Sequence, residues 1–147
     1  MALTSGNLLF DAQINNERRS NRIFKDLSLN FNQNPVTKDI TKVTDVEAIK
    51  RSVRNLISIN HYEKPFHPEI AGGVRALLFE LMSPFTAAQL TKKIEDVINN
   101  FEPRARLVAV RANPDYDRNS YEVSIEFYVV NTPTELVDMT VMLERLR

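Results

Sequence analysis

The spacing of the hydrophobic residues changes near residue 103 from a helical period to a strand period. Before that point, apolar residues recur three or four positions apart in three segments, as they do on one face of an amphipathic helix. The three stripes consist of Val46, Ile49, Val53, Leu56 and Ile57; Val74, Leu77, Leu78 and Leu81; and Leu90, Ile94, Val97, Ile98 and Phe101. The pattern predicts three helices, the first over residues 45–59.

The ends of these helices carry recognisable signals. Residues 44–47 (TDVE) and 86–89 (TAAQ) both have the capping-box form, in which a Thr side chain and an acidic or amide side chain satisfy free N–H groups of the first turn. They predict starts for the first and third helices. Proline cannot continue a helix, so Pro84 is expected to end the second helix and Pro103 the third.

Beyond Pro103 the apolar residues alternate with polar ones, which is typical of strands with one buried face. The predicted buried faces are Val108, Val110 and Ala112; Tyr121, Val123, Ile125, Phe127 and Val129; and Val137, Met139, Val141 and Leu143. Residues 132–147 also suit a helix, but the alternation favours a third strand. The fold class is therefore α+β: three helices followed by a three-stranded, mostly antiparallel sheet with the helices on one face.

The first 34 residues differ from the rest because they are rich in Asn, Ser and Arg and carry only scattered apolar residues. Leu27, Leu29 and Phe31 alternate, which fits a short strand or an arm that becomes ordered against a partner. We expect an N-terminal arm over residues 1–34 and a single domain over residues 35–147.

Composition excludes several classes of protein. The 19 Lys and Arg residues balance 19 Asp and Glu residues, so the chain lacks the positive excess of a general nucleic-acid binder. The absence of cysteine excludes disulfides and zinc-thiolate sites. No apolar run approaches the roughly 18 residues that a membrane span requires, so neither a membrane nor a nucleic acid is expected as a partner.

Candidate chemistry is sparse. His61, Glu63, His67 and Glu69 lie close together in the sequence, but their spacing matches no metal motif and two prolines interrupt them. The candidates for the carboxylate pair of a glycoside hydrolase are Glu63, Glu69, Glu80, Glu95, Asp96 and Glu102. No pattern places two of them across a cleft with one desolvated. We predict no catalytic residue, no metal and no cofactor.

Five segments, taken in order, resemble the baseplate wedge and sheath-initiator family of contractile phage tails, which has a counterpart in type VI secretion baseplates. They are NPVTKDI, IKRSVRNLI, PFHPEIAGGVRALLFE, SPFTAAQLTKKIEDVI and FEPRARL. The most specific element is the triplet Glu102-Pro103-Arg104 between the last helix and the first strand. The resemblance covers residues 34–147 and departs mildly at Lys64, where many members have Arg.

This resemblance implies a structural, non-enzymatic baseplate wedge component of a virion tail that is assembled in the host cytoplasm. Glu102, Pro103 and Arg104 would contact the helical bundle of the larger baseplate wedge proteins. The last strand, with Val137, Met139, Val141 and Leu143, would present its edge to the tail sheath protein and template sheath polymerisation. Residues 1–33 would reach the tail tube or neighbouring baseplate subunits.

Two alternatives stay open. One is a lysozyme-like tail enzyme that degrades peptidoglycan with paired carboxylates. The other concerns the triplet, which also fits a helix stop with a local ion pair between Glu102 and Arg104, worth about 0–1 kcal/mol if exposed. A tailocin or a secretion system fits the residues as well, although the length of the arm favours a phage tail.

Overall fold

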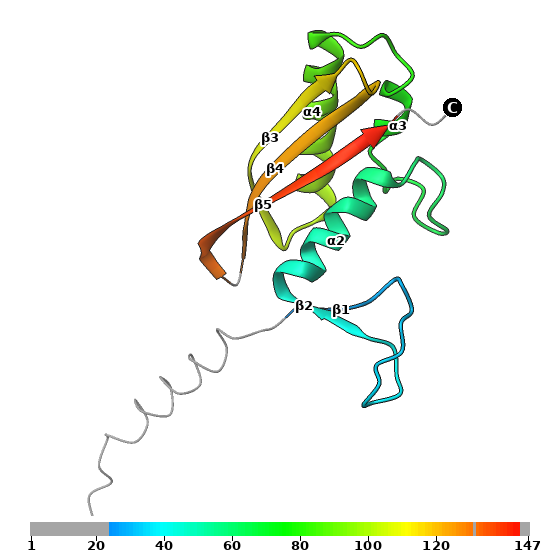
Figure 1. Cartoon of the computed structure of the whole chain (residues 1–147), viewed down its shortest axis with the longest axis vertical. Helices are drawn as coiled ribbons and strands as arrows, with labels where there is room; N and C mark the ends of the chain where they lie inside the picture. The colour runs from blue at the N-terminus through cyan, green and yellow to red at the C-terminus, as the bar shows by residue number, and fades with distance from the viewer. Residues whose placement is uncertain (1–23, 131, 145–147) are drawn as a thin grey trace, which may run out of the picture.

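The computed structural model describes residues 24–130 and 132–144. Its elements, in chain order, are β1 (Lys25–Leu27), β2 (Lys42–Thr44), α2 (Asp45–Ser58), α3 (Val74–Leu77), α4 (Pro84–Phe101), β3 (Ala105–Asp115), β4 (Ser120–Val129) and β5 (Thr132–Glu144). Figure 1 shows a sheet backed by helices, with the small β1–β2 hairpin projecting below the start of α2. The predicted α+β class with helices and a three-stranded antiparallel sheet is confirmed.

The main sheet has the order β3-β4-β5, and both pairings are antiparallel. The central strand β4 follows the predicted alternation closely. Its five apolar residues are all at most 2% exposed: Tyr121, Val123, Ile125, Phe127 and Val129. The segment that also suited a helix is β5, because its alternating residues complete the same buried face.

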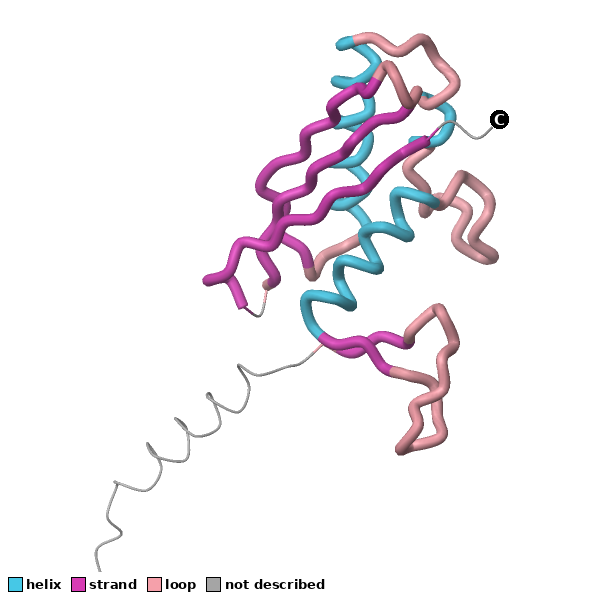
Figure 2. The backbone as a smooth tube through the Cα atoms, viewed as in Figure 1, coloured by secondary structure: helices cyan, strands magenta, loops and turns pink. Residues whose placement is uncertain are grey.

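All three described helices contribute to one hydrophobic core on that face (Figures 1 and 2). In α4, Leu90, Ile94 and Ile98 are fully buried, and in α2, Ile49 and Val53 are fully buried. The helical stripes predicted for the first and third helices therefore face the sheet, as an amphipathic helix requires.

The start of α2 agrees with the prediction, whereas that of α4 does not. Thr44 is the N-cap residue of α2, but its side chain makes no cap hydrogen bond, and it also ends β2, where it pairs with Lys25. At α4 the cap is Ser83, whose Oγ accepts the Thr86 N–H at 3.1 Å, with Pro84 at the first helical position. Proline suits that position because the first turn has no internal partner for its missing N–H. Pro84 therefore starts a helix instead of ending one.

Two further expectations need correction. The second helix is only α3, four residues long, and Leu81 is 86% exposed beyond its end. In β3, pairing moves from Leu107↔Phe127 to Ala109↔Glu126, so Val108 is an unpaired bulge residue and is 51% exposed. A bulge reverses the alternation, because one extra residue shifts the following side chains to the other face.

The β1–β2 hairpin includes the part of the predicted arm that the structure describes. Lys25 pairs with Thr44 and Leu27 pairs with Lys42, so residues 25–27 form a strand. Of the three alternating residues Leu27, Leu29 and Phe31, only Leu27 lies in this strand; Leu29 lies in a turn and Phe31 has a positive φ of 51°. The rest of the arm, residues 1–23 with Leu8, Leu9 and Phe10 among them, lies outside the described residues.

Candidate interaction site at the helix–strand turn

The triplet Glu102-Pro103-Arg104 forms the turn that leads from α4 into β3. The Glu102 N–H donates to the carbonyl of Ile98 at 2.9 Å, which closes the last turn of α4. The Ala105 N–H then donates to the carbonyl of Glu102 at 3.1 Å. This bond closes a four-residue β-turn with Pro103 at its second position, where the fixed φ of proline is favoured. The proline thus ends the helix and reverses the chain direction.

The two charged side chains of the triplet bind each other in a forked geometry. Arg104 Nε donates to Glu102 Oε1 at 2.7 Å, and Arg104 Nη2 donates to Glu102 Oε2 at 2.9 Å. Such paired, parallel bonds are the strong form of an arginine–carboxylate contact. The local ion pair considered from the sequence is therefore present.

Burial makes this pair different from a surface ion pair. The Glu102 side chain is 3% exposed and that of Arg104 is 24% exposed. Burial by itself raises the pKa of Glu102, but hydrogen bonds from Arg104 and Ser52 and the charge of Arg104 outweigh it, so the pKa lies below its ordinary value. The bonds to Glu102 likewise raise the pKa of Arg104. Both groups are charged at neutral pH, so removing Arg104 would leave the buried Glu102 carboxylate without a compensating charge.

Arg104 also binds the N-terminal hairpin. Its Nη1 donates to both carboxylate oxygens of Asp26 on β1, each at 3.1 Å. The guanidinium carbon lies 5.7 Å from the centre of the Phe24 ring, within the range of a cation–π contact. We call Asp26, Glu102 and Arg104 the arginine clasp. The role of Asp26 was not predicted, because 78 residues separate it from Arg104 and it belongs to no motif.

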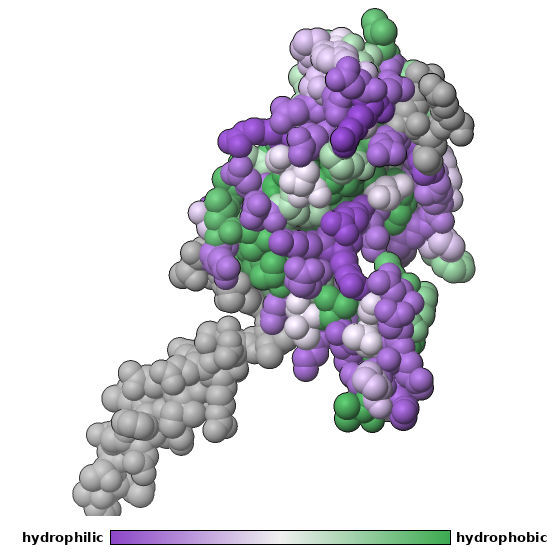
Figure 3. Space-filling view, viewed as in Figure 1, coloured by the Kyte–Doolittle hydropathy of each residue, from purple (hydrophilic) through white to green (hydrophobic). Residues whose placement is uncertain are grey.

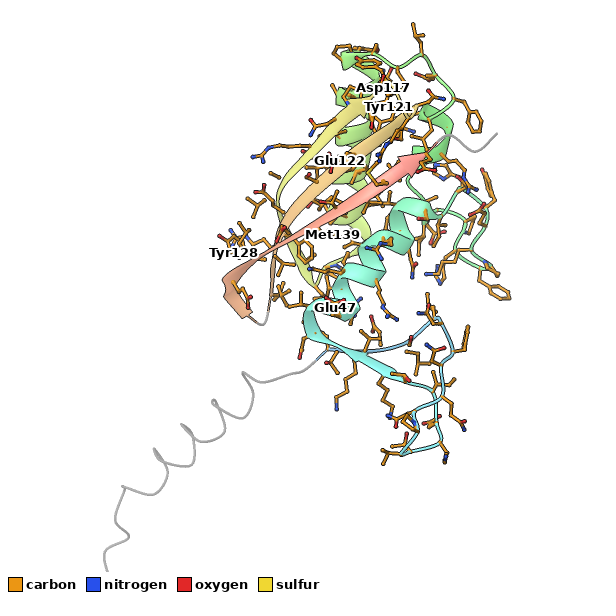
Figure 4. The ribbon with its side chains drawn as sticks, viewed as in Figure 1. Glu47, Asp117, Tyr121, Glu122, Tyr128 and Met139 are labelled. Atoms are coloured by element: carbon orange, nitrogen blue, oxygen red, sulfur yellow. The ribbon has the colours of Figure 1, made fainter. Side chains whose placement is uncertain are left out.

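The start of α2 adds a second link to the same hairpin. The Asp45 N–H donates to the carbonyl of Phe24 at 2.8 Å, and the Phe24 N–H donates to Asp45 Oδ1 at 3.2 Å. Glu47, labelled in Figure 4, marks this first turn of α2. The hairpin is thus held at its base by backbone bonds and by the clasp.

The second predicted site, the β5 edge, has its named side chains turned inward. Val137 and Met139 are 6% exposed and Val141 is 7% exposed, while Leu143 packs partly buried against the core. Figure 4 labels Met139 on β5. A strand added at this edge would therefore meet the β5 backbone first. Within residues 24–130 and 132–144, β4 is the only strand paired with β5.

The acidic and histidine residues do not assemble into a chemical centre. His67 Nδ1 lies 3.0 Å from Glu69 Oε1, whereas Glu63 accepts hydrogen bonds from the N–H and the side-chain amide of Asn60. In the described part of the chain, no three His, Asp or Glu side chains are grouped so as to hold a metal ion. None of the described helices combines the length and the apolar character needed to cross a membrane.

Glu102 is the buried member of the acidic set, and its environment does not suit a general acid. That role requires a carboxyl whose pKa is raised, so that it carries a proton near neutral pH. Arg104 instead lowers the pKa of Glu102.

Comparison with known proteins gives a consistent result. The family model described as baseplate wedge protein gp25 matches residues 43–134. The baseplate wedge protein gp25 of Enterobacteria phage T4 is 29% identical over 123 residues, covering 84% of this chain and 92% of the phage protein.

Three solved structures share the fold. A putative tail lysozyme from Geobacter sulfurreducens has a TM-score of 0.62 at 20% identity, covering 69% of this chain and 91% of that one. A chain of the anti-feeding prophage baseplate has a TM-score of 0.59 at 21% identity, covering 85% and 88%. A chain of the type VI secretion baseplate complex has a TM-score of 0.55 at 14% identity, covering 67% and 93%.

Proposed function

We propose that this chain, which belongs to the baseplate wedge protein gp25 family, is a structural component that docks on larger wedge proteins and starts the tail sheath. Family membership supports the structural baseplate role. The two finer parts of the proposal concern the turn at Glu102-Pro103-Arg104 and the edge of β5.

The turn is suited to docking because its shape is fixed from within. The fork between Glu102 and Arg104 and the hydrogen bond across the turn hold Pro103 exposed at its tip. A preformed loop loses little conformational freedom on binding, which favours affinity. In this proposal Glu102 orients Arg104, and a partner contacts Pro103 and the exposed quarter of the Arg104 side chain.

The β5 edge is the better of the two sheet edges for adding a strand. β3 carries the Val108 bulge and Pro114, both of which interrupt regular pairing at an edge. β5 pairs in unbroken register with β4 from Leu136 to Glu144. Its exposed face mixes the polar Asp138 and Thr140 with Leu136 and Met142, and an added strand would be held mainly by backbone hydrogen bonds along its edge.

The turn can be tested without breaking the clasp. Pro103→Ala keeps both charged side chains and is expected to weaken co-assembly with purified wedge proteins, measured as complex size by light scattering. Pro68→Ala, at another exposed proline, is the matched control. Wild-type co-assembly by Pro103→Ala would remove the docking role from the turn.

A point substitution tests the β5 edge more selectively than a deletion does. Truncation after Val130 is expected to abolish sheath polymerisation, but it also removes Val137 and Met139 from the core. Neighbouring N–H groups of an edge strand point in opposite directions, so one of Thr140→Pro and Val141→Pro removes an N–H that β4 does not use.

The proline variant that retains wild-type melting should bind wedge proteins and fail to start sheaths. If that variant starts sheaths normally, β5 is not the template. Incubation of the wild-type protein with a peptidoglycan suspension should give no clearing. Clearing that disappears in Glu102→Gln would instead establish the lysozyme-like alternative.

A further inference from the structure

The hairpin and α2 enclose a groove that neither the turn nor the β5 edge uses. It has a volume of about 460 Å³ and is lined on the hairpin side by Lys25, Leu27 and Leu29. The α2 side supplies Ala48, Arg51, Ser52 and Asn55. A smaller hollow of about 220 Å³ adjoins it, shares Leu29, Arg51 and Asn55, and adds Arg54. Figure 3 shows the notch that separates the hairpin from the rest of the molecule.

The apolar residues of the hairpin face outward. Leu27 is 57% exposed, Leu29 is 58% exposed and Phe31 is 68% exposed, whereas Ser28 between the leucines is 4% exposed. The pairing Leu27↔Lys42 and the bond from the Ser28 N–H to the carbonyl of Thr41 fix this orientation. The strand register holds Leu27 in solvent, and Leu29 follows in the turn where the Phe31 N–H donates to the carbonyl of Ser28 at 3.0 Å. Neighbouring exposed apolar side chains of this kind mark interaction surfaces.

The charge of the groove is positive. Arg51 donates from Nη1 to Ser28 Oγ at 2.8 Å, a neutral partner. Within the described residues, Lys25, Arg51 and Arg54 form no ion pair with a carboxylate. The acidic residue of the groove, Asp26, is already bound by Arg104. The groove therefore offers exposed leucines next to unpaired positive charges.

We propose that this groove binds an acidic segment of a partner protein that carries leucine-like side chains, and that the arginine clasp holds the hairpin in position to form it. Arginine beside apolar pockets is a common anchor of protein interfaces. A nucleic-acid backbone would use the charges but leave the leucines uncovered, so a protein segment fits better. The β1 side of the groove, with Lys25, Leu27 and Leu29, lies before the span matched by the family model, at residues 43–134, whereas its α2 side lies inside that span.

The inference relies on the proposed function only for the choice of partner proteins. The test uses short overlapping fluorescent peptides from the larger wedge proteins of the same baseplate, with binding to the full chain measured by polarisation. Peptides that are acidic and leucine-bearing should bind, and added salt should weaken them because exposed charges are screened. Leu29→Ser and Arg54→Glu are each expected to weaken binding by about tenfold or more.

Matched controls separate the groove from general surface effects. Leu81→Ser alters a leucine that is 86% exposed outside the groove, and Lys93→Glu reverses an exposed charge on α4. Both should bind peptide as the wild type does. Equal weakening by controls and groove variants would overturn the proposal, as would binding of duplex DNA in place of every peptide.

Two further outcomes are informative. Peptide binding that appears only after deletion of residues 1–23 would show that the chain's own N-terminal segment is the occupant, which overturns the proposed partner. If the intact protein co-assembles with wedge proteins but no peptide binds, the groove proposal fails alone. If co-assembly also fails, the proposed function fails with it.

Discussion

The strand β4 and the β1–β2 hairpin use the same alternating pattern with opposite results. In β4 every second residue from Tyr121 to Val129 is apolar, and helices cover that face. In the hairpin region, Leu27, Leu29 and Phe31 alternate in the sequence in the same way, but only Leu27 lies in a strand and all three are more than half exposed. Alternation thus predicts an apolar strand face, whereas its formation and its covering layer depend on the rest of the fold.

The two regions also differ in what holds them. β4 is stabilised by burial of large side chains, which is proportional to the apolar area removed from water. The hairpin has three paired residues in each strand, and a hairpin of this size is marginal alone. Its attachment depends on directional contacts: the clasp of Asp26 with Arg104 and the reciprocal bonds between Phe24 and Asp45. Substitutions should therefore affect the two regions differently.

The largest effect is expected from Phe127→Ala. Phe127 is fully buried at the centre of the sheet, so the change removes apolar contacts and leaves a cavity. We expect a loss of about 3–5 kcal/mol in the free energy of unfolding, measured by urea denaturation. Phe66→Ala is the control, because Phe66 is 97% exposed and should change stability by less than about 0.5 kcal/mol. Similar losses in both variants would contradict the location of the core.

Arg104→Met should have the next largest effect, because it leaves the buried Glu102 carboxylate without its charged partner. We expect about 2–3 kcal/mol, less than for a fully buried pair because the Arg104 side chain is 24% exposed. Adding Glu102→Gln should restore part of the loss, since it removes the unpaired charge. An unchanged melting temperature in Arg104→Met would show that the pair contributes no stability.

Acidification should weaken the same pair. The folded-state pKa of Glu102 lies below its unfolded value, so the stabilisation is fully present above the unfolded value and is lost as the pH falls through the folded one. Unfolding free energies of the wild type and Glu102→Gln, compared from about pH 7 to pH 3, should converge on acidification. A difference that widens in favour of the wild type at low pH would contradict the lowered pKa.

The smallest effect is expected from Asp26→Asn, which weakens one arm of the clasp. The Asp26 side chain is 38% exposed, so solvent screens the pair and about 0.5–1 kcal/mol is expected. Hydrogen exchange of residues 24–44 should become a few times faster, while β4 keeps its protection. Asp138→Asn, on the exposed face of β5, is the control. Equal acceleration in the hairpin and in β4 would mean that the two regions unfold as one unit.

Much of the main domain could be predicted from short-range patterns. The stripes of α2 and α4 and the alternation of β4 and β5 require only periodicity. The predicted start of α2 after Thr44 was right, although the Thr44 side chain makes no cap hydrogen bond. The predicted start of α4 at Thr86 was wrong, because Ser83 with a following proline caps that helix. The Val108 bulge could not be predicted from the alternation of apolar and polar residues, because that pattern does not show which residue lacks a partner on the neighbouring strand.

The candidate site also combines features that the sequence predicts with features that only the fold creates. The sequence by itself determined the triplet Glu102-Pro103-Arg104, its place between helix and strand, and the apolar row of Leu27, Leu29 and Phe31. Only the tertiary structure decided that Glu102 is buried, that Arg104 also binds Asp26, and that the leucines line an open groove. The physical reason is that periodicity and turn chemistry act between near neighbours, whereas burial and ion pairing depend on residues far apart in the sequence.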